Sequence, residues 1–346
     1  MKLVRTLLIV ALSGGLACGD DDGGTDAGTD TGDTPDVGMD DGGGDTGDTV
    51  ADLTVLLEAE DTITEGLDAG DCDECITDGW AVSFDKYIIA IGEVDLHLST
   101  DETVTAEDAD IFVYDLTQVP AAGDSLWSFT GLQVGTWELN YLQAHGGEGT
   151  RHESVSEEDF AAVAEATYAI EGTMTNGSGR TCPPNTDSVP GGAVADGDGC
   201  YENTSISFNF IADAETVFGP CEAEDGPPGV AVVEGGSTAS LTIHGDHIFF
   251  NGFPEGDEGS IARLAQWLAD CDLNLDGEVT QAELESIAID DLAEIDSRFD
   301  LGGAPPLADD EPLDDMWAYV RTQLKTQGHF NGEGECPVDG VAHMHE

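Results

Sequence analysis

Apolar and polar residues alternate along much of the chain between residues 50 and 254. A period of two places successive side chains on opposite faces of a strand, so each alternating run predicts a half-buried β-strand. The clearest runs are WAVSFDKYIIAIGEVDLHLS, DIFVYDL, VGTWELNYLQAH, ATYAIEGTMT, NTSISFNFIA and STASLTIHG. Turn-forming glycine, proline, aspartate and asparagine separate them. Strands at this short spacing predict an antiparallel β-sandwich over residues 50–254.

The pattern changes to a helical period after residue 255. In SIARLAQWLADC, apolar residues recur at the i, i+3, i+4 and i+7 spacing that marks one face of a helix. TQAELESIA predicts a second helix, and EPLDDMWAYVRTQLKTQG predicts a third that ends at Gly328. The predicted fold class is therefore mainly β with an α C-terminal module over residues 255–346.

The N-terminal segment has the pattern of an export signal. Two basic residues precede a short apolar run and then small residues, which predicts a signal peptide over residues 1–17. The segment resembles a bacterial lipoprotein signal, which implies that Cys18 is lipidated and anchors the chain to a membrane. The alternative is plain cleavage after Ala17 and secretion. We expect an exported, outer-membrane or periplasm-facing lipoprotein.

Residues 18–49 follow as an acidic stretch of Gly, Asp and Thr that contains no aromatic residue. Such a segment buries too little apolar area to offset its ordering entropy, so it is expected to be a disordered linker. The whole chain has 9 basic and 73 acidic residues and a formal net charge of −64. This charge opposes binding to nucleic acid, which is itself a polyanion.

Cysteine use agrees with export, because oxidising compartments favour disulfides. Seven cysteines follow the N-terminal one, so one thiol is left over or pairs outside the chain. Cys182 and Cys200 bracket a Pro/Gly/Asp-rich excursion that a disulfide would close, and a second disulfide could join Cys271 to Cys336. For the CDEC sequence at 72–75 we expect structural disulfides, with a redox or metal pair as the alternative.

One acidic stretch, DLNLDGEVTQAE at 272–283, also has glycine and oxygen-bearing residues at specific positions. A calcium loop of the EF-hand type needs oxygen ligands at positions 1, 3, 5 and 7, glycine at 6 and a bidentate glutamate at 12. The matching ligands are Asp272, Asn274, Asp276, Glu278 through its backbone carbonyl, and Glu283. Gly277 supplies the turn, and Val279 is the aliphatic residue that packs inward.

The loop resembles the EF-hand family, and the resemblance implies Ca²⁺ as the ligand. EF-hands usually occur in pairs, whereas this chain has one intact loop; residues 290–303 could be a decayed partner. A single loop should bind calcium more weakly than a pair, but extracellular calcium is abundant, so a site with a dissociation constant of about 10⁻⁴–10⁻³ M would still be filled. We therefore expect a structural role for calcium and no sensor function.

Histidines suggest a second kind of site. His244 and His247 lie close together in TIHGDHIF, and strands could bring His97 to them as imidazole ligands for Cu or Zn. His145 is a further candidate. The alternative is that these are ordinary polar or capping histidines. The middle region, with SFTGLQVGTWELNY, resembles transthyretin-like and copper-binding β-sandwich proteins exported by bacteria.

No nucleophile elbow, HExxH helix, phosphate loop or dinucleotide fingerprint occurs in the sequence, so an enzyme is not the expected class. The leading function is a calcium-binding, surface-anchored structural or interaction lipoprotein. The alternatives are a histidine-based Cu or Zn protein and an unidentified extracytoplasmic enzyme. The protein partner stays open.

Overall fold

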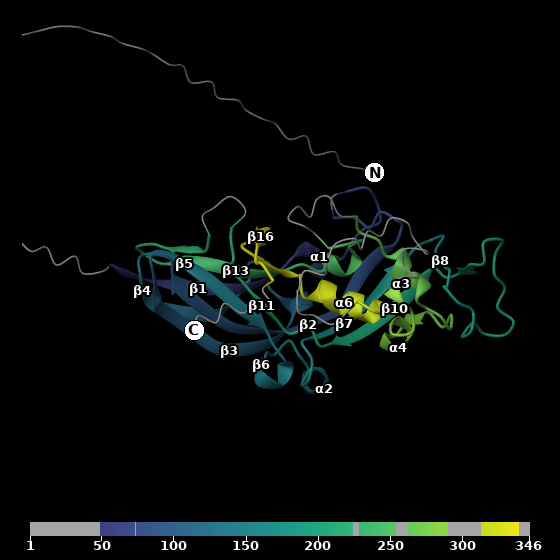
Figure 1. Ribbon diagram of the computed structural model, residues 1–346, viewed down its shortest axis with the longest axis horizontal. Helices are drawn as coiled ribbons and strands as arrows, with labels where there is room; N and C mark the ends of the chain where they lie inside the picture. Colours follow the sequence, from purple (N-terminus) through teal and green to yellow (C-terminus); the bar gives the residue numbers. More distant parts are fainter. Residues whose placement is uncertain (1–48, 73, 224–227, 254–261, 290–312, 339–346) are drawn as a thin grey trace, which may run out of the picture. The chain divides into compact units, whose positions relative to one another are not determined.

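The computed structural model describes residues 49–72, 74–223, 228–253, 262–289 and 313–338 (Figure 1). The expected signal peptide, Cys18 and nearly all of the acidic linker lie outside these residues. So do the start of the first expected C-terminal helix, the segment 290–303 and the C-terminal tail.

The first sheet has five strands in the order β16-β15-β13-β1-β4. Their bounds are Gly334–Glu335 for β16, Gly328–Phe330 for β15, Ser237–Ile243 for β13, Val50–Ala59 for β1 and Asp124–Gln133 for β4. β1 and β13 run parallel, with Ala59 opposite Ile243, whereas β15 runs antiparallel to β13. Three chain segments therefore meet at the same end of these neighbouring strands: the carboxyl ends of β1 and β13 and the first residues of β15.

The second sheet has nine strands around the long strand β2 (Ala81–Leu98). Its main path is β11 (Thr216–Phe218), β5 (Gly135–Gln143), β2, β7 (Tyr168–Thr175), β10 (Ser205–Ala212) and β14 (Glu278–Val279). β3 (Asp101–Asp115) pairs with β2 and with β6 (Thr150–Arg151), and β12 (Val230–Val232) pairs with β5. A separate small sheet joins β8 (Arg180–Thr181) to β9 (Tyr201–Glu202).

Most of the long strands between residues 81 and 243 form where the alternation predicts them, because one face of the strand is buried. Leu53, Val55 and Leu57 of β1 are fully buried in the same core cluster as Tyr87 and Ile89 of β2. The second face of β2 is also covered: Ile88 and Ala90 lie in a smaller cluster with Val163, next to α2 (Glu157–Ala162). The β-rich fold that we expected is confirmed.

The segment after residue 262 is less helical than its sequence pattern predicts. It contains α3 (Gln266–Asp270), α4 (Gln281–Leu284) and α6 (Met316–Leu324), which Figure 1 shows in yellow beside β10. Strand β14 lies between α3 and α4 and belongs to the second sheet. Strands β15 and β16 follow α6 and belong to the first sheet. A separate helical module is thus not shown.

Two of the helix bounds differ from the expectation for physical reasons. The first helix begins only at Gln266, because the backbone of Arg263 forms bridges with Ile76 and Phe250. The third helix ends at Leu324, and Gly328, the expected stop, opens β15. The remaining helical turns are α1 (Asp61–Thr64), η1 (Leu116–Gln118), η2 (Gly146–Glu148) and η3 (Asp246–Phe249).

Disulfides are present, and the Cys182–Cys200 bond agrees with the sequence expectation. The expected bond between Cys271 and Cys336 is wrong. Cys336 pairs with Cys221, and Cys271 is a buried free thiol whose sulfur contacts the carbonyl oxygen of Trp267. Cys271 sits at the end of α3 inside the core, whereas Cys336 follows β16 beside Cys221. The two cysteines of CDEC, Cys72 and Cys75, are bonded to each other.

Candidate metal centres

The loop 272–283 lies between α3 and α4 and makes the sharp turn that its glycine predicts. Gly277 has φ +83°, in the left-handed region where glycine carries no Cβ penalty, and Leu275 has φ +57°. Within the loop, β14 pairs in parallel with β10, which places Val279 opposite Phe208. Val279 is fully buried, so its side chain fixes the loop to the core of the second sheet.

The oxygens at loop positions 1, 3 and 5 fold back onto the loop's own backbone. Asp272 accepts from the N–H groups of Asp276 through Oδ1 (3.1 Å) and of Gly277 through Oδ2 (3.0 Å). Asn274 Oδ1 also accepts from Asp276 N (2.8 Å), and Asp276 Oδ1 accepts from Glu278 N (3.0 Å). These hydrogen bonds hold three of the sequence-predicted ligand side chains close to the same turn of backbone.

Glu283, at position 12, spans the loop from its far end. Its Oε1 accepts from Leu273 N (3.1 Å), and its Oε2 accepts from the backbone N–H (2.9 Å) and hydroxyl (2.8 Å) of Thr280. Thr280 in turn caps the first turn of α4 through Glu283 N, which completes a capping box. The same glutamate therefore caps the helix through Oε2 and reaches back to the beginning of the loop through Oε1.

The first ligand, Asp272, is fully buried and sits among other carboxylates. Asn203 Nδ2 donates to its Oδ2 at 2.9 Å. Burial raises the pKa of Asp272, the N–H of Gly277 opposes that shift, and the negative charges of Glu283 and Asp276 add to it. A cation would relieve this concentration of negative charge.

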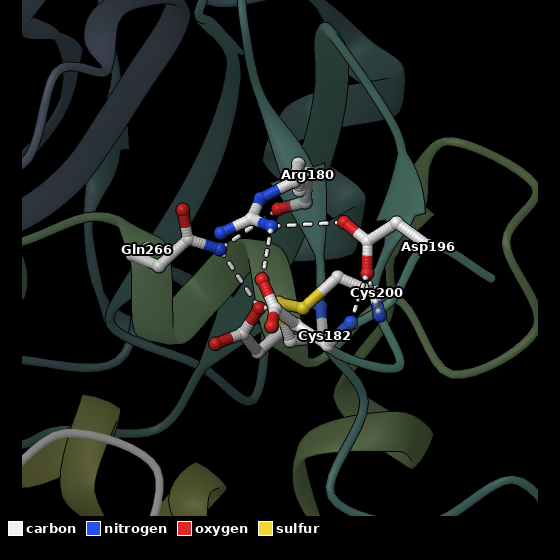
Figure 2. Close-up of polar contacts among 7 residues, drawn as sticks. Arg180, Cys182, Asp196, Cys200 and Gln266 are labelled. Atoms are coloured by element: carbon white, nitrogen blue, oxygen red, sulfur yellow. Dashed lines mark hydrogen bonds and ion pairs between the residues drawn. A yellow bond between two sulfur atoms is a disulfide. The ribbon is translucent and has the colours of Figure 1, made fainter.

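α3, the helix that precedes the loop, is held against the segment that the Cys182–Cys200 disulfide closes, as Figure 2 shows. Gln266 Nε2 donates to the carbonyl oxygen of Arg180 and to Asp270 Oδ1, both at 2.8 Å. The same Asp270 oxygen accepts from Cys182 N at 2.7 Å, next to the Cys182–Cys200 bond. These contacts fix α3 against β8, and Asp270 lies two residues before Asp272, the first of the sequence-predicted calcium ligands.

His97 and His145 lie apart from the other predicted histidines. His97 Nε2 contacts Asp95 Oδ2 at 2.5 Å on β2, and among the described residues it belongs to no convergent group of metal-ligating atoms. His145 Nε2 contacts Asp213 Oδ1 at 3.0 Å. This hydrogen bond raises the pKa of His145, although partial burial opposes the shift.

The structure brings His244 and His247 together with a third histidine, His329. One ring nitrogen of each lies within 4.8 Å of the others, and the three residues are 2%, 0% and 3% exposed. His329 was missed because it lies on β15, 82 residues after His247 in the chain. Only the pairing of β15 with β13 makes them neighbours, and the sequence signal was no more than a histidine in the Gly-rich GHFNGEGEC stretch.

Two carboxylates complete this cluster. Glu60 follows β1, and its Oε2 lies 3.4 Å from His244 Nδ1; Asp246 begins η3 and forms a buried ion pair with Arg263 at 2.5 Å. Burial, and then the charge of Asp246, raises the pKa of Glu60 to about 8. We call Glu60, His244, Asp246, His247 and His329 the histidine cluster.

Comparisons of the chain with protein families, with curated proteins and with solved structures found no match. No helix among the described residues is long and apolar enough to cross a membrane.

Proposed function

We propose that the protein is a calcium-binding structural protein, exported and held at a membrane by a lipid on Cys18, in which loop 272–283 takes one Ca²⁺. The observation that carries the proposal is the arrangement of the loop oxygens. Asp272, Asn274, Asp276 and Glu283 all turn inward onto the same loop backbone, at the spacing that calcium loops use.

Calcium in this loop would stabilise the fold and would not open it. Val279 is buried against β10, and α3 is fixed to β8 through Gln266 and Asp270, so both ends of the loop are packed. A sensor needs helices that can swing apart to expose an apolar groove. A packed loop instead gains stability by mass action, about 2.7 kcal/mol when free calcium is 100 times the dissociation constant.

The test is a thermal-unfolding titration of the intact chain with CaCl₂ and, separately, MgCl₂. Wild type is expected to gain several degrees in Tm at millimolar calcium, whereas Glu283→Gln shows no calcium-dependent gain. Glu285→Gln is the matched control, because Glu285 lies just after the loop at the end of α4 and contacts Gln281, which is not one of the expected ligands. The readout is the calcium-dependent shift, since Glu283→Gln also weakens the capping box.

Terbium luminescence gives a second readout of the same site. Trp267 is buried in α3, five residues before Asp272, so excitation of this indole is expected to sensitise a Tb³⁺ ion in the loop. Calcium should displace the terbium signal in wild type. A calcium-independent Tm together with no displaceable terbium emission would reject the calcium proposal.

A further inference from the structure

We propose that His244, His247 and His329 hold one late first-row transition-metal ion, with Zn²⁺ the best match, and that Glu60 completes the site. This inference does not depend on the calcium proposal, because the histidine cluster and the loop share no residue. It extends the sequence expectation of a Cu or Zn site by replacing His97 with His329 and by adding a carboxylate.

The topology explains why these residues meet. Glu60 directly follows β1 and His244 directly follows β13. These two parallel strands are paired and end side by side, so Glu60 and His244 leave them at the same end. Glu60 N donates to Ile243 O at 3.1 Å, which fixes the two chain segments there. His329 enters from the antiparallel neighbour β15, where it lies opposite Thr242.

Contacts around the rings determine which nitrogens can bind a metal. Thr326 Oγ1 donates its one proton to Gln323 O (2.8 Å), so it accepts from His247 Nδ1 (2.8 Å). The neutral His247 ring then presents a lone pair at Nε2. His244 Nε2 donates to the carbonyl oxygen of Gly332 (3.4 Å), which leaves a lone pair at Nδ1. A second-shell hydrogen bond that fixes the tautomer is the usual arrangement for metal-ligating histidines.

Two pairs of donor atoms have the separation of neighbouring ligands on a tetrahedral ion. His247 Nε2 lies 3.3 Å from His329 Nε2, and His244 Nδ1 lies 3.4 Å from Glu60 Oε2. Two ligands at 2.0–2.1 Å from a tetrahedral ion are about 3.3–3.4 Å apart.

Charge and burial point to the same kind of ligand. Asp246 is already neutralised by Arg263, whereas Glu60 contacts Thr62 (2.6 Å) and His244. A divalent ion would balance the charge of an ionised Glu60. Imidazole ligands favour zinc, copper, nickel or iron over calcium and magnesium, and a closed tetrahedral site is typical of structural zinc.

The experiment is a Zn²⁺ titration of the chelator-treated intact chain by isothermal calorimetry. Millimolar CaCl₂ is present throughout, so that the calcium loop does not compete. Wild type is expected to bind one equivalent, and His329→Gln is expected to lose at least 100-fold in affinity. His97→Gln is the matched control, because it removes a histidine outside the cluster. Equal binding by wild type and His329→Gln, or no binding by folded wild type, would overturn the proposal.

A measurement on wild type keeps the test valid if His329→Gln does not fold. Tetrahedral Co²⁺ with nitrogen ligands gives intense visible bands, and one equivalent of CoCl₂ is expected to produce them and one equivalent of ZnCl₂ to remove them. X-ray absorption of the zinc-loaded protein should show imidazole scattering. A zinc shell of oxygen alone would contradict the site, whatever the variants do.

Discussion

Loop 272–283 and the histidine cluster are assembled in opposite ways. All proposed calcium ligands of the loop come from one short segment, and a turn of backbone is enough to bring their oxygens together. The histidine cluster takes residues from after β1, from after β13 and from β15, so it exists only when three strands are paired. The loop should therefore depend on local conformation, and the cluster on the integrity of the sheet.

The largest expected effect comes from removing the disulfide that holds β15 and β16. Cys221 and Cys336 enclose 115 residues, and the chain-entropy estimate for a loop of this size is about 5 kcal/mol, whereas the 18-residue Cys182–Cys200 loop gives about 3 kcal/mol. We expect Cys221→Ser/Cys336→Ser to lose more stability in urea denaturation than Cys182→Ser/Cys200→Ser.

The two disulfide variants should also separate the two proposed metal sites. Loss of the bond to Cys336 frees the hairpin that carries His329, so Zn²⁺ affinity should fall while calcium affinity is kept. Loss of the Cys182–Cys200 bond loosens the support of α3 and should do the reverse. Equal losses of both metals in both variants would show that the two regions are not independent.

The next effect concerns the second shell of the histidine cluster. Thr326→Val keeps the volume of the side chain but removes the oxygen that orients His247. We expect Zn²⁺ affinity to fall about 10–100-fold, the range for lost second-shell partners, with calcium affinity unchanged. Thr326→Ser, which retains the hydroxyl, should bind as wild type does in competition titrations with a chelator. A Thr326→Val protein with full affinity would contradict the assigned tautomer.

Two glycines give a smaller and more local comparison. Gly277→Ala places a Cβ at φ +83°, where it meets the carbonyl oxygen of Ser205 at an ordinary contact distance of 3.6 Å, so the backbone strain of about 1–2 kcal/mol dominates. Gly245→Ala instead drives its Cβ to 2.6 Å from Ile63 Cγ1, an overpacking of about 1–3 kcal/mol. Thermal unfolding should show weaker calcium dependence only for the first and weaker zinc dependence only for the second.

The same contrast between local and long-range contacts explains which features the sequence could predict. The β-rich fold could be predicted, because the burial of alternate residues is a local property of each strand. The parallel pairing of β1 with β13 and the docking of β15 could not, since strand order depends on contacts between segments distant in the chain. That is why His244 and His247 were identified and His329 was missed.

Cysteine pairing and helix bounds show the same limit. The Cys182–Cys200 bond was predictable because the two residues flank one excursion. Pairing of Cys336 depended on whether Cys221 or Cys271 lay beside the end of β16, which no local pattern encodes. The helical period before Cys271 was real, but backbone bridges from Arg263 shortened the helix.

The smallest expected effect concerns His145, a histidine outside both sites that serves as a reference for the cluster. Its pKa is raised by the hydrogen bond with Asp213, so Asp213→Asn should move the pKa back toward the ordinary value in an NMR titration. A raised folded-state pKa stabilises the protein below the unfolded value of 6.5, and this gain is lost as pH rises through the folded value. The stability difference between wild type and Asp213→Asn should therefore be greatest at pH values below 6.5 and vanish in alkaline solution. Because the pair is partly exposed, the difference should stay below about 1 kcal/mol.

Zinc should leave the titration of His145 unchanged, and a zinc-dependent shift there would mean that the ion binds outside the histidine cluster.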